Sequence, residues 1–208
     1  MRSGRILVAG RELLIARPED PESLIDEARF DEDEFLPYWA ELWPSGIELA
    51  DLVAKLDLRG KRVIEVGCGL ALPSLAAALA GAEVLATDWA QEAVDLVVVN
   101  AEENGLALAA AVLDWGSVRV GEIGQFDLVL AADVLYEERN AVPLLQLLEA
   151  VVVPGGGVLI ADPGRRHAAV FFEFARSAGW PSEPVGSGRI VSLRRDRPGA
   201  THAHRPCT

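Results

Sequence analysis

The sequence contains few of the features that mark secreted or membrane proteins. Only two cysteines occur in 208 residues, Cys68 between two glycines and Cys207 in the C-terminal tail. A structural disulfide is therefore not expected. No apolar run reaches the 18 or so residues of a membrane span. The N-terminus also lacks the apolar region and cleavage site of a signal peptide. These absences predict a cytoplasmic protein with no membrane partner.

Positive charge is scarce as well. Lys plus Arg is 19 against 32 Asp plus Glu, a net charge of −13, and the only lysines are Lys55 and Lys61. So much negative charge repels a phosphate backbone, which argues against a nucleic-acid partner and would suit a basic one. Selection for solubility alone would give the same charge. The preference for arginine over lysine is typical of a GC-rich bacterial genome.

The order of apolar segments predicts an α/β fold. Two short strands around Gly10 and an acidic, partly helical stretch over residues 21–35 come first, and a helix over residues 47–56 follows. From residue 61 onward, apolar strands alternate with helices. The strands are expected at residues 61–66, 83–88, 106–114, 126–133, 157–162 and 188–196. The helices are expected at residues 70–82, 90–105, 140–152 and 165–180, with Pro154 to Gly157 ending the third.

Such alternation is typical of a doubly wound, mostly parallel sheet that is covered by helices on both faces. Within this fold we expect three parts. Residues 1–43 would cover a pocket, residues 44–195 would form the domain, and residues 196–208 would be a disordered tail.

A glycine turn, Gly67-Cys68-Gly69, joins the first of these strands to a helix. Glycine allows a tight turn and the close approach of a ligand, and the helix start presents free N–H groups. Glu65, just before the turn, is expected to face the start of the helix or to help orient the turn. The dinucleotide fingerprint GxGxxG fails because its third glycine position is Leu72. A nicotinamide-dependent oxidoreductase is therefore disfavoured.

The next two strands each end in an Asp-Trp pair, Asp88-Trp89 and Asp114-Trp115. In a doubly wound sheet, successive strand ends line one crevice. Asp88 could accept hydrogen bonds from both hydroxyls of a ribose, Trp115 could flank a base, and Asp114 could accept from an exocyclic amine. This arrangement describes a nucleoside pocket. Taken singly, Asp88 could instead cap a helix and either tryptophan could belong to the core.

EVGCG at residues 65–69, Asp88 and the pair Asp114-Trp115 resemble the class I S-adenosylmethionine-dependent methyltransferases. The resemblance covers about residues 36 to 195. It implies a seven-stranded, Rossmann-like sheet with a short N-terminal extension, S-adenosylmethionine as cofactor, S-adenosylhomocysteine as product, no metal, and a monomer. Many members have a third loop glycine where this sequence has Ala71. We expect tighter packing there and not a loss of binding.

Three further segments narrow the resemblance. PYWAELWPSG at residues 37–46, LDW at 113–115 and ADVLY at 132–136 are similar to the family-16 protein methyltransferases, which are largely lysine N-methyltransferases. ADPGR at residues 161–165 resembles the branch that methylates the β subunit of electron-transfer flavoprotein. The implied partner is a protein with an accessible lysine, or else a small amine.

The resemblance places Trp43 against the methionine side of the cofactor, where its ring could make a cation–π contact with a sulfonium worth about 0.5–2 kcal/mol. Its segment would form a front wall over the pocket. Tyr38 and Trp39 either share in that wall or only fix the segment to the sheet.

The resemblance also assigns the acceptor site to Asp133 and Tyr136, which match a DxxY motif just past the strand ending at Ala132, itself an expected cofactor contact. The Asn/Asp-Pro-Pro-aromatic signature of nucleic-acid amino methyltransferases is absent at this place. A nearby carboxylate raises the pKa of an amine, so Asp133 is expected to orient the amine while its proton leaves to water. Tyr136 would line the channel or accept a hydrogen bond.

The turn from Asp162 to Arg165 could meet a protein acceptor or could only cap the next helix. Two other functions remain open. A small-molecule N- or O-methyltransferase would use the same fold, and an enclosed, apolar crevice over Asp133 would favour it. Intact Asp88, Asp114 and Asp133 argue against a non-catalytic cofactor-binding or interaction module, which undetectable S-adenosylmethionine binding would support.

Overall fold

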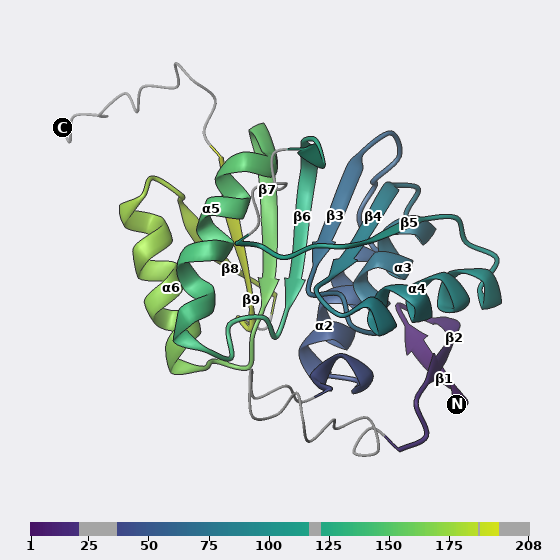
Figure 1. Ribbon diagram of the computed structural model, residues 1–208. Helices are drawn as coiled ribbons and strands as arrows, with labels where there is room; N and C mark the ends of the chain where they lie inside the picture. Colours follow the sequence, from purple (N-terminus) through teal and green to yellow (C-terminus); the bar gives the residue numbers. More distant parts are fainter. Residues whose placement is uncertain (21–36, 117–121, 187, 196–208) are drawn as a thin grey trace.

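The computed structural model describes residues 1–20, 37–116, 122–186 and 188–195. A seven-stranded sheet runs through the molecule in the order β5-β4-β3-β6-β7-β9-β8 (Figure 1). β9 pairs antiparallel with β7 and with β8, and the other neighbours are parallel. The predicted fold class is confirmed. The strands are β3 (Arg62–Val66), β4 (Glu83–Asp88), β5 (Ala109–Val112), β6 (Phe126–Ala132), β7 (Val152–Ala161), β8 (Ser182–Val185) and β9 (Ile190–Arg194).

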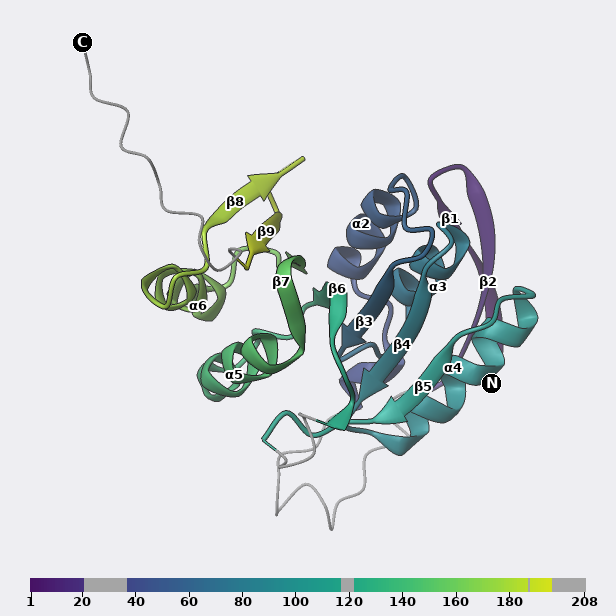
Figure 2. The ribbon, with the colours of Figure 1, turned by 90° about the horizontal axis from the view of Figure 1, so that it is seen from above.

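Helices cover both faces of this sheet, as the view from above shows (Figure 2). One face carries α2 (Pro44–Val53), α3 (Leu72–Leu79) and α4 (Gln91–Glu103), and the other carries α5 (Ala141–Val151) and α6 (Arg166–Ser177). The short 3-10 helices η2 (Tyr38–Ala40) and η4 (Glu138–Asn140) precede α2 and α5. Among the described residues, no helix is long and apolar enough to cross a membrane.

Each face has its own apolar core. Leu144, Leu148 and Phe171 of α5 and α6 are fully buried against the sheet, in one cluster with Ile64 and Ile160. Side chains three and four positions apart share one helix face, so the apolar spacing of α5 turns a continuous stripe toward the sheet. Burying each such side chain contributes about 1.5–3 kcal/mol. The second cluster joins α2, α3 and α4 to the opposite face.

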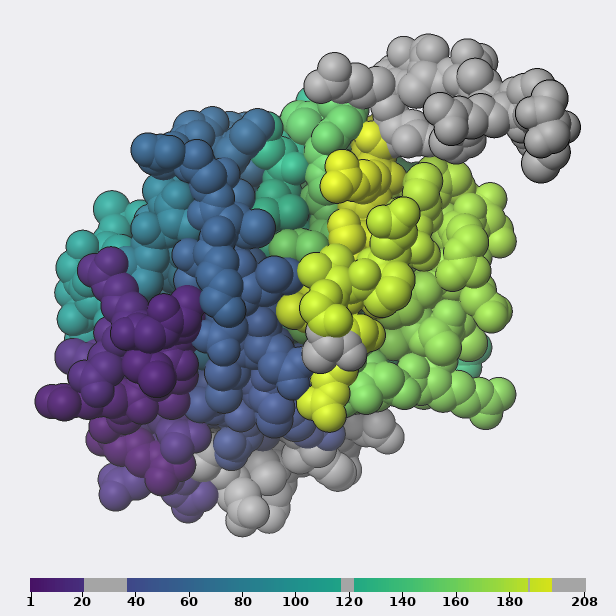
Figure 3. Space-filling model, turned by 180° about the vertical axis from the view of Figure 1, so that it is seen from behind, coloured from purple at the N-terminus to yellow at the C-terminus, as the bar shows by residue number. Residues whose placement is uncertain are grey.

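The N-terminal strands β1 (Arg2–Val8) and β2 (Arg11–Arg17) form an antiparallel hairpin outside the main sheet. The two strands around Gly10 are thus confirmed. The hairpin packs beside α4, and from behind it lies next to α2 and the chain that follows α2 (Figure 3). The acidic stretch over residues 21–35 and the tail over residues 196–208 lie outside the described residues.

Two local features differ from the sequence prediction. β8 was not expected, because SEPV has no apolar alternation, and Pro184 is tolerated since the strand lies at the sheet edge. Pro154 to Gly157 was expected only to end a helix, but it lies within β7, where an irregularity lets Phe126 pair with Val152 and Leu128 with Gly157. A Cβ at Gly156 would lie 2.9 Å from the Val153 carbonyl oxygen, so only glycine fits there.

Candidate active site

The glycine turn leaves β3 in a left-handed conformation at two positions. Gly67 has φ +64° and Gly69 has φ +48°. A Cβ at Gly67 would lie 2.8 Å from Val134 Cγ1, and a Cβ at Gly69 would lie 3.0 Å from the backbone oxygen of Trp39. Both glycines are therefore required by crowding as well as by conformation. Ala71, which ends the turn, also has a positive φ of 60°.

Replacing Gly67 with alanine should lower both stability and ligand affinity. The left-handed conformation costs roughly 1–2 kcal/mol for an L-residue, before the contact with Val134 is counted. At about 2–4 °C per kcal/mol, Tm should fall by roughly 3–8 °C. Gly46→Ala is the matched control, because Gly46 is helical with no atom near the new Cβ, and its Tm should rise slightly. Equal Tm values for Gly67→Ala and the unaltered protein in thermal unfolding would contradict this reading.

Asp88 ends β4 and connects this turn to α4. It is only 4% exposed. Its Oδ2 accepts a hydrogen bond from Gly69 N at 2.9 Å, and its Oδ1 accepts one from Ala90 N at 3.1 Å. Burial raises the pKa of Asp88, and these backbone hydrogen bonds oppose that shift. Asp88 thus fixes the glycine turn and the start of α4, and its oxygens retain lone pairs for a ligand.

Trp115 lies against the same turn. Its Cζ2 would be 3.7 Å from a Cβ at Gly67. Asp114 is exposed, and its Oδ1 accepts a hydrogen bond from Gly116 N at 2.9 Å, while Trp89 is 53% exposed. Of these residues, the structure places Trp115 beside the glycine turn.

Cys68 and Glu65 support the turn from beneath. The Cys68 side chain packs with Ala71 and Val97 in a small apolar cluster, so a ligand contact would have to come from its backbone. Burial raises the pKa of its thiol. Glu65 is 1% exposed, and its Oε2 accepts a hydrogen bond from Ser74 N in α3 at 2.8 Å. This contact matches the expectation that Glu65 orients the start of the helix.

The buried Glu65 should make stability depend on pH. Burial raises its pKa from 4.5 to about 8, because the charged form is poorly solvated there. The folded state therefore holds a proton that the unfolded state releases, and stability should fall as the pH rises from about 4.5 to about 8. Glu65→Gln should flatten that part of a Tm-against-pH curve, while Glu103→Gln, at an exposed position, should not. Parallel curves for all three proteins would show the reading to be wrong.

Asp133 follows β6 in a left-handed conformation, φ +59°. Its backbone N donates to Ala161 O at 2.9 Å, and its Oδ1 accepts a hydrogen bond from Arg165 Nη1 at 2.6 Å. Its Oδ2 is buried and has no hydrogen-bond partner within the described part of the chain. Ala132, just before it, is partly buried at the end of the strand.

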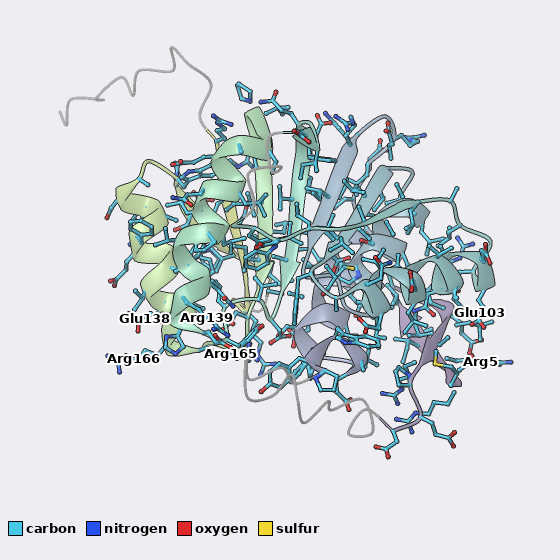
Figure 4. All side chains as sticks on the ribbon, in the orientation of Figure 1. Arg5, Glu103, Glu138, Arg139, Arg165 and Arg166 are labelled. Atoms are coloured by element: carbon cyan, nitrogen blue, oxygen red, sulfur yellow. The ribbon has the colours of Figure 1, made fainter. Side chains whose placement is uncertain are left out.

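The turn from Asp162 to Arg165 leads directly into α6, and among the described residues no side chain caps the first turn of that helix. Asp162 Oδ1 accepts hydrogen bonds from Gly164 N at 2.8 Å and Arg165 N at 2.7 Å, and its Oδ2 contacts Arg165 Nη1 at 3.0 Å. The pairing of Arg165 with Asp133 was missed by sequence reasoning. Figure 4 shows Arg165 at the end of the molecule where β6 and β7 end. The sequence did contain a signal for this pairing. Asp133 and Asp162 each follow a strand, and these two strands, β6 and β7, are neighbours in the sheet.

The aromatic segment before α2 lies between the glycine turn and Tyr136. The Tyr38 ring lies 5.6 Å from the Tyr136 ring and 6.1 Å from the Trp43 ring, centroid to centroid. Trp43 Nε1 donates to Tyr38 O at 2.9 Å, and Trp39 presents its backbone to Gly69. Tyr38, Trp43 and Tyr136 are all partly solvent-exposed. The structure therefore places this segment beside both halves of the predicted site.

The model of a family described as lysine methyltransferase matches residues 29–177, which is most of the chain. The chain belongs to the lysine methyltransferase family. This confirms the family resemblance drawn from ADVLY and PYWAELWPSG.

Individual relatives in the lysine methyltransferase family agree with this assignment. Protein N-lysine methyltransferase METTL21A of Danio rerio is 37% identical over 118 residues, 53% of this chain and 54% of its own length. The electron transfer flavoprotein beta subunit lysine methyltransferase of the same organism is also 37% identical, over 133 residues, 62% of this chain and 51% of its own. The chain spans about half the length of these curated relatives, and their equal identities do not favour either branch.

Solved structures share the fold of this lysine methyltransferase family member. The T. thermophilus 16S rRNA methyltransferase RsmC, solved in complex with AdoMet and guanosine, superimposes with a TM-score of 0.67 at 15% identity. The match covers 93% of this chain and 50% of the other. An identity this low supports the fold alone.

A separate cleft of about 700 Å³ lies between the hairpin, Trp39 and α4. Its walls include Glu19, Glu92 and Asp95 over the apolar side chains of Leu96 and Val99. It includes none of the predicted cofactor or acceptor residues. Across the described ranges, no group of three or more His, Cys, Asp or Glu side chains could hold a metal ion.

Proposed function

We propose that this protein transfers a methyl group from S-adenosylmethionine to a lysine side chain of a protein. The observation that carries the proposal is the convergence of the glycine turn, Asp88, the aromatic segment and the DxxY pair at one end of the sheet. Membership of the lysine methyltransferase family supports the reaction class. A protein lysine is proposed as the acceptor because the relatives are named as lysine methyltransferases of proteins.

The residues present fit a cofactor that contains a nucleoside and a sulfonium. Because Gly67 and Gly69 carry no side chains, a ligand can approach the backbone of the glycine turn closely. Asp88 supplies a buried carboxylate for ribose hydroxyls, and Trp115 lies beside Gly67 of the same turn. Trp43 supplies an exposed aromatic ring near Tyr38. Glu65, Cys68, Trp89, Asp114 and Ala132 complete the proposed cofactor contacts.

The bound cofactor would supply a methyl group on a positively charged sulfur. The site must then hold the acceptor lysine as a neutral amine, because an ammonium has no lone pair to form the new C–N bond. A lysine side chain in water has a pKa of about 10.4, so neutralising it at pH 7 costs roughly 4–5 kcal/mol. Most of the remaining acceleration should come from holding the amine in line with the methyl group.

Asp133 and Tyr136 are proposed to hold that amine. Asp133 is poorly suited to act as a general base, because its Oδ1 already accepts a charged hydrogen bond from Arg165. Its Oδ2 could accept a hydrogen bond from the amine. Burial raises the pKa of Tyr136, so its hydroxyl stays neutral at working pH and can donate or accept. The proton of the amine would pass to water.

The alternative acceptor is a small amine or hydroxyl compound. The partial exposure of Tyr38, Trp43 and Tyr136 favours a protein acceptor, because a metabolite site would enclose its ligand. The monomeric state, the lack of a nucleic-acid or membrane partner, and a bacterial cytoplasmic origin stay predictions of the sequence.

Incubation with methyl-labelled S-adenosylmethionine and cell lysate tests the proposal. We expect label on a discrete, protease-sensitive band, absent with an Asp88→Asn variant and present with Asp95→Asn, which alters an exposed carboxylate on α4. Label confined to small molecules would replace the proposal with the metabolite alternative. No label, together with no cofactor binding in calorimetry, would refute methyl transfer altogether.

A further inference from the structure

The neighbouring ends of β6 and β7 bring three charged side chains into contact. Arg165 Nη1 donates to Asp133 Oδ1 at 2.6 Å and to Asp162 Oδ2 at 3.0 Å. Both carboxylates are more than nine-tenths buried, and the Arg165 side chain is 26% exposed. One arginine therefore links the carboxylate expected to meet the acceptor to the turn that precedes α6.

The Asp133 carboxylate is only half satisfied. Its Oδ1 is held by Arg165, but its Oδ2 is buried without a hydrogen-bond donor among the described residues. A buried acceptor with no donor is costly, and such a cost persists where the surroundings fix the group for a function. The backbone of Asp133 is fixed as well, because its left-handed conformation is held by the bond from its N to Ala161 O. Oδ2 is thus a buried acceptor without a donor among the described residues, and a ligand N–H that reached it would satisfy it.

The charge of Arg165 matters to an approaching amine. A bare carboxylate would favour the ammonium form, which cannot attack a methyl group. Arg165 offsets that charge at hydrogen-bond distance. Burial would lower the pKa of Arg165, but the hydrogen bonds to Asp133 and Asp162 outweigh it and raise that pKa. The guanidinium therefore stays charged across the whole working pH range.

We propose, on the basis of the proposed function, that Arg165 is the positioning residue of the acceptor site. It holds Asp133 by one oxygen, leaves Oδ2 to accept a hydrogen bond from the amine N–H, and offsets the negative charge that would keep the amine protonated. Asp133 then binds the amine in its neutral, reactive form.

Other charged and titratable groups surround this pair. They are Asp162 after β7, Glu48 of α2 with Arg189 before β9, Tyr136 and the Glu137–Arg139 pair after β6, and Arg166 and His167 on α6. Each is present in every variant below except where it is itself replaced. If the pH midpoint of the methyl-transfer rate moves only when Arg165 is replaced, the titration of these other groups is therefore not the cause.

The test is the pH dependence of methyl transfer to the protein that carries the label in the lysate experiment. In Arg165→Met, the rate should reach half its maximum at a pH about 1–2 units higher than in the unaltered protein, because Asp133 is left uncompensated. Arg165→Lys should keep the original midpoint with a lower kcat, since the charge remains and the double contact is lost. Arg165→Met combined with Asp133→Asn should move the midpoint back. Cofactor affinity should stay within about twofold in all three.

Arg189→Met is the matched control, because it breaks a 2.8 Å pair with Glu48 and should leave the pH midpoint unmoved. A rate loss in Arg165→Met that is equal at every pH would overturn the proposal and leave Arg165 a structural residue. The pair itself is tested without methyl transfer by thermal unfolding. The double variant should be more stable than Arg165→Met, since one fewer buried carboxylate is left without its counterion. If no acceptor is ever labelled, the proposed function fails, while this unfolding comparison still decides whether the pair is coupled.

Discussion

Replacing Asp88 with asparagine should weaken S-adenosylmethionine binding by at least about 100-fold. Hydrogen bonds to a charged acceptor contribute roughly 1.5–3 kcal/mol each, and a ribose offers two hydroxyls. The asparagine would also turn an amide N–H₂ toward either Gly69 N or Ala90 N, where Asp88 now accepts two backbone hydrogen bonds. Part of the loss should therefore come from a displaced glycine turn.

Stability should change much less than affinity in this variant. The raised pKa of Asp88 shows that burial opposes its charge, and a neutral amide removes that opposition. Titration calorimetry and thermal unfolding of Asp88→Asn, with Asp95→Asn as the exposed control, separate the two effects. A dissociation constant within a few-fold of the original would remove Asp88 from the proposed cofactor site.

Replacing Asn100 with alanine should destabilise the protein by roughly 2–4 kcal/mol. Asn100 is fully buried in α4, and its side chain accepts from Ala16 N at 2.7 Å and donates to Ala16 O and Leu70 O. Alanine would leave these backbone groups without their partner, at about 1–3 kcal/mol for each buried group. Leu70 follows Gly69, so the glycine turn should loosen along with the hairpin.

The measurement is Tm, which should fall by about 5–15 °C in Asn100→Ala. Asn104→Ala is the matched control, since Asn104 bonds Leu14 in the same way, with Leu14 N donating to its Oδ1 at 2.9 Å, but at a more exposed place where water can replace the side chain. Its Tm should fall by only a few degrees. Equal losses in the two variants would show that burial of Asn100 is not the cause.

The sequence allowed the sheet and the glycine turn to be predicted because their signals are local. Apolar runs mark the central strands, and Gly67 and Gly69 mark a turn that only glycine can make beside Val134 and Trp39. The Asp-Trp pairs could be placed at strand ends because each directly follows such an apolar run. β8 escaped prediction because its four residues, two of them polar and one a proline, carry no alternation.

The contacts that sequence reasoning missed join segments far apart in the chain. Arg165 and Asp133 are 32 positions apart and meet only because β6 and β7 are neighbours. Asn100 and Ala16 are 84 positions apart, and nothing near either residue indicates that a helix asparagine would bind a hairpin strand. The aromatic segment posed a similar problem. Trp39 lies against the glycine turn through its backbone, and the identity of a side chain does not predict a backbone contact.

The central claim is that Asp88 and the glycine turn serve a methyl transfer to a lysine amine at Asp133. Mass spectrometry of the labelled lysate protein, digested after reaction, tests it most directly. The account predicts the methyl group on the ε-nitrogen of one lysine, lost with Asp88→Asn and retained with Asp95→Asn. A methyl group on any other atom, or one that persists in Asp88→Asn, would contradict it.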